Sequence, residues 1–474
     1  RFRFSPKFSV APMSSPRFRP YEEDVDVQSP NRNLAPLGAE VDQEGQLWVG
    51  GCRLADLADH YGTPLYVLDE TTLRAGCQAY CRALVRHYPG KSLVLYASKA
   101  HSSLAMAALM ASEGLGLDAV SAGELLTALG GGMDPRNMVL HGNNKSRDEL
   151  RLALEHGVTV VLDNWLELDL LERLCGQQGQ RARLLIRFTP GIECHTHEYI
   201  RTGHLDSKFG FDLEELDTVL QRLATASWAD VAGLHAHIGS QIFELQPHED
   251  LAAVMVKALA RARALGHHPK DLNVGGGLGV RYVDSDDPPA IAAWVQTVSA
   301  AVVAACRQQQ QPLPRLLCEP GRSLVATAGL TLYQVGSRKE IPGVRTYVAV
   351  DGGMSDNPRP ITYQSRYTAC LPQRCRDAAT DTVTVAGKHC ESGDVLLHHI
   401  PLPPVASGDL LAVLATGAYN ASMGSNYNRI PRPAAVLVQG GQAQLVQRRE
   451  THQDLLRWDI LPEHLCQPGA VPIR

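Results

Sequence analysis

Short apolar runs alternate with helix-length amphipathic segments between residues 93 and 318. Apolar runs bounded by polar or glycine positions are typical of buried strands, and the longer segments are typical of helices. Residues 249–265 are one such helical segment, and another begins after Ser146-Arg-Asp-Glu149, which is a capping box. The strands are predicted at residues 93–97, 117–120, 138–140, 158–162, 184–186, 231–237, 272–274 and 316–318.

These eight strand-then-helix units predict the architecture of the middle of the chain. A series of eight favours a (β/α)8 TIM barrel, because that is the number of units with which this fold closes. A doubly wound open sheet is the alternative, and periodicity alone does not exclude it.

Both ends of the chain carry strand patterns instead. Residues 39–49 predict two short strands around a turn at Glu44-Gly45, and residues 435–446 predict a hairpin around Gln439-Gly-Gly-Gln442. Further strands are predicted at residues 65–68, 382–385 and 409–413. We therefore expect a β-rich domain formed by the chain ends, residues 34–68 and 325–474, and a barrel over residues 69–324.

Residues 1–33 differ from the rest of the chain. The first 20 residues contain several Arg, Ser and Pro and no acid. They predict a disordered or targeting extension, or an upstream segment before a true start at Met13. The segment has no apolar core of the kind that a secretory signal needs. We expect a cytoplasmic protein, or a plastid one if residues 1–33 are a transit peptide.

Charge and cysteine content exclude several classes of protein. The 474 residues include 45 Lys+Arg and 50 Asp+Glu, a net charge of −5, which gives no reason to bind nucleic acid or an anionic membrane. The longest apolar stretch, residues 291–306, is interrupted by polar residues and predicts a helix rather than a membrane span. The eleven cysteines include no Cys-x-x-Cys pair, which argues against structural zinc and favours a reducing compartment.

In a barrel of this kind, reactive side chains lie just after the carboxyl ends of the strands. Polar residues are common at strand ends, so the residue types are more informative than their polarity. The positions at the predicted strand ends are Lys99, Asp118, His141, Asn143, Asp163, Arg187, His237, Gly275, Gly276, Gly277, Glu319 and Arg322.

Two of these turns predict a phosphate site. Gly275-Gly-Gly-Leu-Gly279 follows the seventh strand, and Glu319-Pro-Gly-Arg-Ser323 follows the eighth. Glycines let backbone N–H groups approach an anion closely, and the loops after strands seven and eight are the usual phosphate site of this fold. Tight turns without a ligand are the alternative for either turn taken alone.

Lys99 ends an apolar strand at the barrel mouth. Desolvation there would lower its pKa and make the amine nucleophilic toward a carbonyl carbon, whereas a surface lysine would have neither property. A phosphate site opposite such a lysine suggests a phosphorylated aldehyde, and pyridoxal phosphate is the obvious one. His235 and His237 lie on one face of a strand and could be a metal pair, satisfied core residues, or a ring against a planar cofactor; no third metal ligand is evident.

The motifs together resemble those of the fold-type III pyridoxal-phosphate decarboxylases, and within them the diaminopimelate decarboxylases. The resemblance covers residues 34 to about 460. The motifs that carry it are Tyr96-Ala-Ser-Lys-Ala100, His141-Gly-Asn-Asn-Lys-Ser146, His195-Thr-His-Glu-Tyr199, Ser207-Lys-Phe-Gly210, His235-Ala-His-Ile-Gly-Ser-Gln241, Gly275-Gly-Gly277, Glu319-Pro-Gly-Arg322, Asp351-Gly-Gly-Met354, Cys390-Glu-Ser-Gly-Asp394, Gly417-Ala-Tyr419 and Ala421-Ser-Met-Gly-Ser-Asn-Tyr427.

The resemblance implies an alanine-racemase-like barrel with pyridoxal 5′-phosphate as its cofactor and no metal. Lys99 would hold the cofactor as a Schiff base, His237 would stack on its ring, and Glu319 would pair with the pyridine nitrogen. The remaining cofactor-binding residues implied by the motifs are Asp118, Ser240, Gly275, Gly276, Gly277, Pro320, Gly321, Arg322 and Tyr419.

The resemblance also implies a homodimer with shared active sites. Cys390 would return a proton to the carbon that has lost CO2, and it would come from the partner subunit. Without the family, Cys390 would be interpreted as a buried filler thiol.

The substrate implied is meso-2,6-diaminopimelate, which gives L-lysine and CO2, the last step of lysine biosynthesis. Arginine can grip a distal carboxylate with two hydrogen bonds, and an acid suits a distal ammonium. The matching substrate-binding residues are Arg322, Arg359, Tyr363, Glu391 and Tyr419. The chain departs from the family at Asp356-Asn-Pro-Arg-Pro360, where many relatives carry an apolar residue before the Arg.

Two alternatives stay open. One is another fold-type III decarboxylase, acting on carboxynorspermidine, ornithine or arginine. The other is a non-catalytic regulatory homologue that binds a partner enzyme, although Lys99, Glu319 and Cys390 are all retained. A racemase is disfavoured. The similarly folded alanine racemases carry an Arg beside the pyridine nitrogen, which makes the ring a weaker electron sink, whereas this chain has Glu319 at that position.

Overall fold

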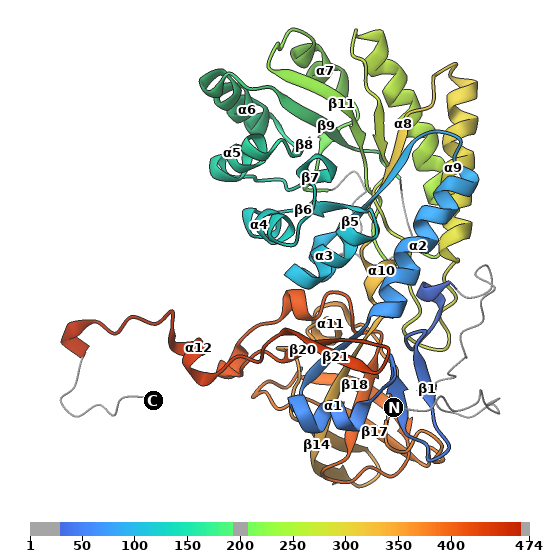
Figure 1. Cartoon of the computed structure of the whole chain (residues 1–474), viewed down its shortest axis with the longest axis vertical. Coiled ribbons are helices and arrows are strands. Elements are labelled where there is room, and N and C mark those ends of the chain that lie inside the picture. Colours follow the sequence, from blue (N-terminus) through green and yellow to red (C-terminus); the bar gives the residue numbers. More distant parts are fainter. Residues whose placement is uncertain (1–28, 193–206, 466–474) are drawn as a thin grey trace. The chain divides into compact units, whose positions relative to one another are not determined.

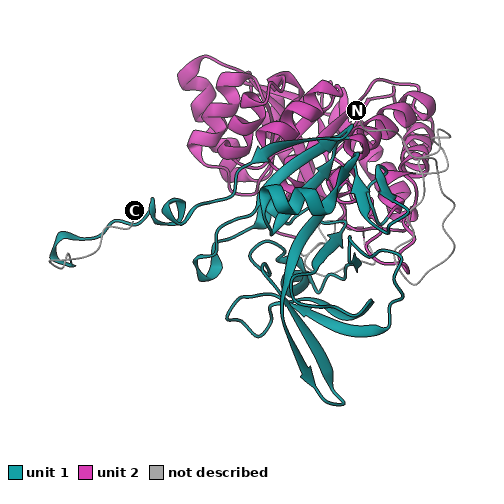
Figure 2. Cartoon of the chain, turned by 60° about the horizontal axis from the view of Figure 1, so that its bottom comes forward, with its two compact units in different colours: residues 1–20, 34–70, 329–474 teal, residues 21–33, 71–328 magenta. Residues whose placement is uncertain are grey.

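The chain forms two compact units (Figure 2). A computed structural model describes residues 29–192 and 207–465. Among these, residues 29–33 and 71–328 form one unit, and residues 34–70 and 329–465 form the other. The predictions for residues 1–28, for the motif at residues 195–199 and for the C-terminal end beyond residue 465 lie outside the described residues.

The first unit is a closed barrel of parallel strands, of which β5 to β9 and β11 are labelled in Figure 1. Its strands are β5 (Ser92–Ala97), β6 (Gly116–Ala119), β7 (Met138–Leu140), β8 (Thr159–Leu162), β9 (Ala182–Thr189), β11 (Ala229–His235), β12 (Asp271–Asn273) and β13 (Arg315–Cys318). Each pairs in parallel with its neighbours, and β8 pairs with β9 to close the ring. The eight-stranded TIM barrel is therefore confirmed, and the open sheet is wrong. The short β10 (Phe211–Asp212) adds to β9 outside the ring.

Helices follow the strands in the order that the sequence predicts. They are α2 (Glu70–His87), α3 (Leu104–Ser112), α4 (Ala122–Gly130), α5 (Arg147–His156), α6 (Trp165–Gln178), α7 (Leu216–Ala224), α8 (Gln246–Ala264), α9 (Ile291–Gln308) and α10 (Arg322–Val325), with short 3-10 turns η1 (Pro30–Arg32), η2 (Ser98–Ala100) and η3 (Pro135–Asn137). The predicted capping box is confirmed: the Ser146 hydroxyl and the Glu149 carboxylate each accept a backbone N–H at the start of α5. Gly157 ends that helix with φ +70°, a conformation that glycine adopts without strain.

Apolar side chains fill the interior of the barrel. One buried cluster takes a residue from each of six strands, namely Leu95, Val139, Val161, Leu185, Ala232 and Leu317. Strands on opposite sides of a ring can meet only across its interior, so this cluster is the packed barrel core. The polar positions at the carboxyl ends of the strands therefore lie at one end of an apolar barrel interior.

The second unit is built from both chain ends, as predicted. Its elements before the barrel are β1 (Ala39–Val41), β2 (Leu47–Val49), β3 (Cys52–Arg53), α1 (Leu54–Tyr61) and β4 (Leu65–Asp69). Those after it are β14 (Gly329–Ile341), β15 (Arg345–Val350), α11 (Arg359–Tyr363), β16 (Ala369–Cys370), β17 (Asp381–Ala386), β18 (Val395–Leu402), β19 (Leu410–Leu414), η5 (Ala421–Met423), η6 (Tyr427–Arg429), β20 (Ala434–Gln439), β21 (Gln442–Gln447), α12 (His452–Leu456) and η7 (Glu463–Leu465).

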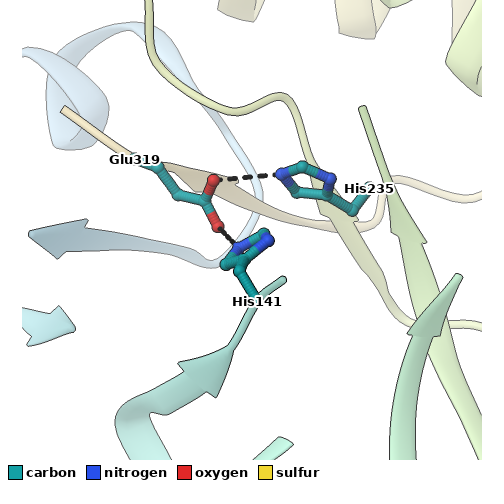
Figure 3. A group of neighbouring side chains, drawn as sticks. All are labelled: His141, His235 and Glu319. Carbon is teal, nitrogen blue, oxygen red and sulfur yellow. Dashed lines mark hydrogen bonds and ion pairs between the residues drawn. The ribbon is translucent and has the colours of Figure 1, made fainter. Parts of the chain in front are cut away.

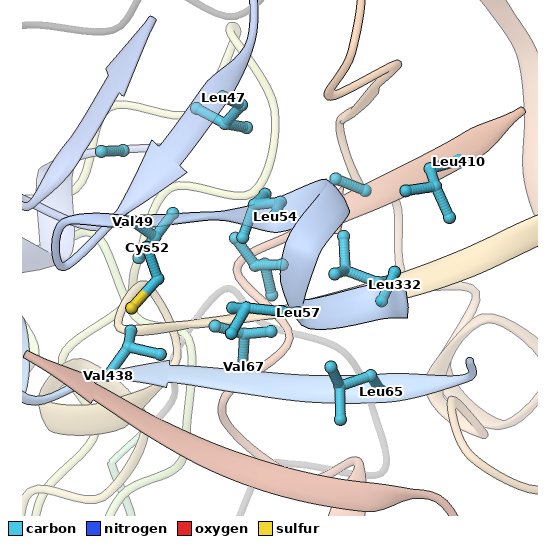
Figure 4. Packing of buried hydrophobic residues seen from close by; sticks show 14 of the residues in the cluster. Leu47, Val49, Cys52, Leu54, Leu57, Leu65, Val67, Leu332, Leu410 and Val438 are labelled. Atoms are coloured by element: carbon cyan, nitrogen blue, oxygen red, sulfur yellow. The ribbon is translucent and has the colours of Figure 1, made fainter. Parts of the chain in front are cut away.

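A single sheet joins the two ends of the chain in this unit. Its order is β18-β17-β15-β14-β4-β20-β21, so that β4 lies between β14 and β20. Leu54 and Leu57 of α1 pack over this sheet against Leu65 and Val67 of β4 (Figure 4). Burying a leucine side chain fully contributes about 1.5–3 kcal/mol, so the N-terminal segment is held to the rest of the sheet by its core as well as by its hydrogen bonds.

Asn31, in the segment assigned to the N-terminal extension, is fully buried and donates to Gly279 O at 3.0 Å, so the described end of that extension is packed against the barrel. None of the helices that the structure describes is long and apolar enough to cross a membrane. The described cysteines are all free thiols, and Cys390 is the one that is exposed.

Candidate active site

A buried carboxylate is the centre of the polar cluster at the barrel mouth. Glu319 directly follows β13, and its Oε1 lies 2.7 Å from His141 Nε2, which follows β7. Its Oε2 lies 3.0 Å from Nε2 of His235, at the end of β11. Asn273, at the end of β12, donates a third hydrogen bond to Oε1 at 2.7 Å. Figure 3 shows the carboxylate directed between the two imidazole rings.

This arrangement keeps Glu319 ionised. Burial raises the pKa of its carboxyl, but His141 and His235 beside it outweigh burial and hold that pKa well below its usual range. Burial lowers the pKa of His235 to about 3, so this imidazole is neutral near pH 7. A carboxylate can only accept, which means that both Nε2 atoms donate to it.

The grouping differs from the metal pair that the sequence leaves open. His235 lies with His141 and Glu319, whose ligand atoms are within 4.8 Å of one another, rather than with His237. Hydrogen bonds to both carboxylate oxygens already account for this placement. His237 faces the glycine turn, where its Nδ1 accepts the N–H of Gly276 at 3.2 Å. Burial, and then the charge of Lys99, lowers the pKa of His237 well below its usual value.

The glycine turn after β12 has no room for side chains. A Cβ on Gly276 would lie 2.3 Å from Glu319 O, and one on Gly275 would lie 2.6 Å from His237 Nδ1. Gly275 and Gly277 also have φ values of +67° and +118°, which L-residues rarely adopt. The turn therefore packs closely against Glu319 and His237, and Gly275 also donates its N–H to Asn273 Oδ1 at 3.0 Å.

The turn after β13 is equally tight. Pro320 O accepts the N–H of Ala97 at 3.1 Å, which joins this turn to the end of β5. A Cβ on Gly321 would lie 3.0 Å from the Cβ of Ala97. Gly321 precedes α10, whose first residue is Arg322.

Arg322 connects three elements of the barrel mouth. Its Nη2 donates to Ser240 Oγ at 2.9 Å, and its Nη1 donates to Tyr282 Oη at 2.7 Å. Arg322 is 6% exposed, so its charge is buried beside Ser240, one of the predicted phosphate residues. Ser240 and Arg322, predicted from separate motifs, are thus brought together.

Lys99 differs in one respect from its prediction. It lies in η2, just after β5 as expected, but it is exposed rather than desolvated. The desolvation argument for a nucleophilic amine is therefore wrong for the chain by itself. Its charge still acts on the site, because it is among the groups that shift the pKa of Asp118 and His237.

Asp118 lies at the end of β6 and is almost fully buried. Its Oδ1 lies 3.8 Å from His141 Nε2 and makes no hydrogen bond among the described residues. Burial raises the pKa of Asp118, against the opposing charges of His141 and Lys99. The two acids Asp118 and Glu319 thus have pKa values shifted in opposite directions.

A buried ion pair supports the loop that carries His141. Lys145 Nζ lies 2.5 Å from Glu167 Oε1, and both side chains are 1% exposed. The same ammonium donates to Gly142 O at 2.8 Å and to Val161 O at 2.7 Å. Lys145 therefore attaches the residue after His141 to the end of β8.

In the second unit, Cys390 and Glu391 are exposed on the turn between β17 and β18. The N–H of Cys390 donates to Asn428 Oδ1 at 2.9 Å. Beneath the turn, the carboxylate of the buried Asp394 accepts two hydrogen bonds, one from His389 Nδ1 at 2.7 Å and one from the N–H of Met354 at 2.7 Å. The turn is thus exposed at its tip and fixed at its base.

The predicted distal-carboxylate residues lie in the same unit. Arg359 begins α11, is 5% exposed and donates from Nη1 to Tyr367 Oη at 2.6 Å. Tyr363 ends that helix and is half-buried. Tyr419 has φ +59° and is half-buried in the turn after β19. A Cβ on Gly393 would lie 2.7 Å from Ile361 of α11, so this helix packs against the Cys390 turn.

The predicted site residues therefore fall into two groups, one in each unit. Sequence reasoning missed Asn273 and Tyr282, which bond Glu319 and Arg322. A polar residue inside the short apolar strand before the glycine turn was the available signal for Asn273. No comparable signal marks Tyr282.

Comparisons of the sequence find similar known proteins. Residues 74–326 match the family model for the pyridoxal-binding domain of pyridoxal-dependent decarboxylases. The chain is 54% identical over 445 residues to a diaminopimelate decarboxylase of Synechocystis, covering 92% of this chain and 95% of the relative. It is 48% identical over 422 residues to that of Bacillus subtilis, covering 88% and 96%.

A solved structure has a similar fold. Diaminopimelate decarboxylase of M. jannaschii in complex with L-lysine superimposes with a TM-score of 0.84 at 32% identity. The match covers 93% of this chain and 100% of that one.

Proposed function

The chain belongs to the diaminopimelate decarboxylases, a branch of the pyridoxal-dependent decarboxylases, and from this premise we propose how its residues share the reaction. The enzyme decarboxylates meso-2,6-diaminopimelate to L-lysine and CO2 with pyridoxal 5′-phosphate as cofactor, the last step of lysine biosynthesis. One carboxylate leaves as CO2, and one proton is added to the carbon that carried it. The chain must hold the cofactor, keep its ring charged and deliver that proton.

Glu319 is the observation that carries the proposal. When bound, the cofactor supplies a conjugated ring that takes up the electron pair left by CO2. Glu319 would pair with the ring nitrogen and keep it protonated. Three donors support this role, since His141, His235 and Asn273 keep the acid anionic in a buried site.

The other barrel residues fit the cofactor by their chemistry. Lys99 would anchor it covalently through its aldehyde, His237 would lie against the ring, and Asp118 would lie nearby. Arg322 suits a phosphate, because a guanidinium is a strong donor to it, and the glycine turn has no side chains that would keep a ligand from its backbone. Two N–H groups of that turn are used within the protein, since Gly275 donates to Asn273 Oδ1 and Gly276 donates to His237 Nδ1. The phosphate residues proposed are Ser240, Gly275, Gly276, Gly277, Gly321 and Arg322, together with Tyr419 of the β-rich unit. Pro320 is proposed as a further cofactor-binding residue.

Cys390 Sγ would deliver the proton, from the second subunit of a homodimer. The thiol and Glu391 are exposed on their turn, which supports a role toward another copy of the chain. Arg359 and Tyr363, with Arg322, would bind the distal carboxylate of the substrate, and Glu391 would bind its distal ammonium. Arg359 is held by Tyr367 in advance, which reduces the entropy lost on binding.

An assay of the purified protein tests the activity. We expect CO2 release from meso-diaminopimelate with an equal amount of L-lysine, and none from L-lysine or L-ornithine, which have no distal carboxylate for Arg359. Comparable rates with ornithine would instead favour another decarboxylase of the family. If the purified protein has no activity on any of these substrates and shows no absorption band of bound cofactor, a regulatory homologue is favoured.

Mixing two inactive variants tests the shared site. A hybrid of Lys99→Ala and Cys390→Ala subunits has one intact site only if the two residues come from different chains. Random pairing would then restore about a quarter of wild-type activity, since half of the dimers are hybrids with one working site of two. Activity that stays at the level of the separate variants would mean that each chain supplies both residues to its own site.

A further inference from the structure

Gln241 has a backbone conformation that its residue type does not favour. Its φ is +59°, in the left-handed region that glycine adopts freely and side chains with a Cβ seldom do. Non-glycine residues persist there only when surrounding contacts hold them, and such positions concentrate at functional sites. Gln241 directly follows Ser240, one of the residues proposed to bind phosphate.

The side chain of Gln241 makes the contacts that hold it. Its Nε2 donates to Val280 O at 2.8 Å, and its Oε1 accepts the N–H of Val280 at 3.1 Å. The side-chain amide thus pairs with one backbone residue as a neighbouring strand would. This pairing is specific for an amide of this length, because a carboxylate has no donor and asparagine is one methylene shorter.

The paired residues belong to two loops that both reach the proposed phosphate site. The loop after β11 contains His237 and Ser240, and the loop after β12 contains the turn Gly275–Gly277. Their backbones also bond directly, from Ile242 N–H to Gly277 O at 2.9 Å and from Gly279 N–H to Ile242 O at 3.1 Å. The amide of Gln241 extends this short ladder by two bonds.

We propose that Gln241 is a positioning residue that fastens the Ser240 loop, through Val280, to the loop that carries the glycine turn, so that the phosphate site is formed before the cofactor arrives. The inference rests on the proposed function, which assigns Ser240 and the glycine turn to the cofactor phosphate. The pairing requires Gln241 to keep an unfavourable left-handed backbone conformation. In return, the two loops lose less conformational freedom when the phosphate binds. We call the pairing of the Gln241 side chain with Val280 the clamp. The clamp acts on the phosphate end of the cofactor, whereas Lys99 acts on its aldehyde end.

Comparing pyridoxal 5′-phosphate with pyridoxal isolates this effect. Cofactor is removed from wild type and from Gln241→Ala, and each ligand is titrated back while the absorption band of the lysine-bound form is followed. We expect the variant to bind pyridoxal 5′-phosphate about tenfold more weakly, the loss that one to two net hydrogen bonds would cause. Its affinity for pyridoxal, which has no phosphate, should match that of wild type.

Gln310→Ala is the matched control. Gln310 has φ +53° in the exposed turn between α9 and β13, so the same substitution carries the same backbone penalty. This turn precedes the amino end of β13, whereas the proposed cofactor residues of the barrel follow the carboxyl ends of the strands. Both affinities should stay at the wild-type value. If Gln241→Ala fails to fold, Gln241→Gly removes the clamp at a φ that glycine adopts freely, with the same expected loss.

The outcomes separate this inference from the one on which it rests. Wild-type affinity of the Gln241 variant for pyridoxal 5′-phosphate, or equal losses for both ligands, would overturn the clamp alone. If wild type binds the two ligands equally well, the phosphate site itself is misassigned, and the clamp is overturned with it. At saturating cofactor the variant should regain wild-type kcat, because Gln241 does not contact the reacting atoms.

Discussion

Glu319 and Cys390, the two groups proposed to handle charge and proton, are built in opposite ways. Glu319 is buried in the barrel unit with both oxygens hydrogen-bonded. Cys390 is exposed at the tip of a turn, although the base of that turn, at Asp394, is 3% exposed. A group that keeps one charge throughout the reaction is best held dry and fixed. A group that gives up and regains a proton, near a substrate that enters and leaves, needs access on a rigid support.

The largest expected effect comes from removing the exposed group. Cys390→Ala should lower kcat about a thousandfold, within the range that a positioned proton donor contributes. The absorption band of bound cofactor should be unchanged, since the buried group is intact. Cys81→Ala, at a half-buried free thiol, is the control and should keep wild-type kcat. A rate for Cys390→Ala within a factor of two of wild type would remove it as the proton donor.

The position of the buried acid could be predicted from the sequence, but its partners could not. The apolar runs place Glu319 and His141 at strand ends, and the barrel brings strand ends together. Which side chains then meet depends on ring closure, because His141 and Glu319 are 178 residues apart in the chain and Asn273 and Glu319 are 46 apart. The exposure of Lys99 was likewise unpredictable, since a strand pattern says where a side chain begins and not which atoms cover it.

The second expected effect tests the buried half of the comparison. Glu319→Gln should lower kcat on the order of a hundredfold, because a neutral amide no longer keeps the ring nitrogen protonated and its NH2 group would face an imidazole N–H. Asp271→Asn is the control. Asp271 is a buried acid paired with Arg315 at the opposite ends of the strands, so its loss should lower stability and leave kcat intact.

Equal kcat values for Glu319→Gln and wild type would break the comparison. They would mean that Glu319 is a structural acid, and that its burial serves folding alone. The circular dichroism spectrum and thermal midpoint of the variant, set beside those of Asp271→Asn, separate a lost charge from a lost fold.

In the β-rich unit, strand patterns predicted the elements, but they did not predict which hydrogen bonds support the Cys390 turn. The hairpin at residues 435–446 and the strands at residues 382–385 and 409–413 are confirmed. The bond from Met354 to Asp394, however, joins residues 40 apart and involves a backbone N–H, for which no sequence pattern exists. The family motif marked Asp394 as the end of Cys390-Glu-Ser-Gly-Asp394 without saying what it holds.

The smallest effect concerns that support. In Asp394→Asn, an NH2 group would replace an oxygen that accepts N–H groups from His389 or Met354, so donors would face each other and the turn would shift. We expect kcat to fall about tenfold, less than for Cys390→Ala, because the thiol remains but is misplaced. The rate at which iodoacetamide labels Cys390, followed by peptide mapping, should change as well.

Asp409→Asn provides the matched control for this last change. Asp409 also accepts a backbone N–H, from Ala406, and pairs with Arg374 in the same unit. Its amide should leave both kcat and the labelling rate of Cys390 at wild-type values. If Asp394→Asn behaves in the same way, the exposed thiol does not depend on its buried base. The contrast with Glu319 would then be one of exposure only, because a turn that tolerates a broken base is not a rigid support.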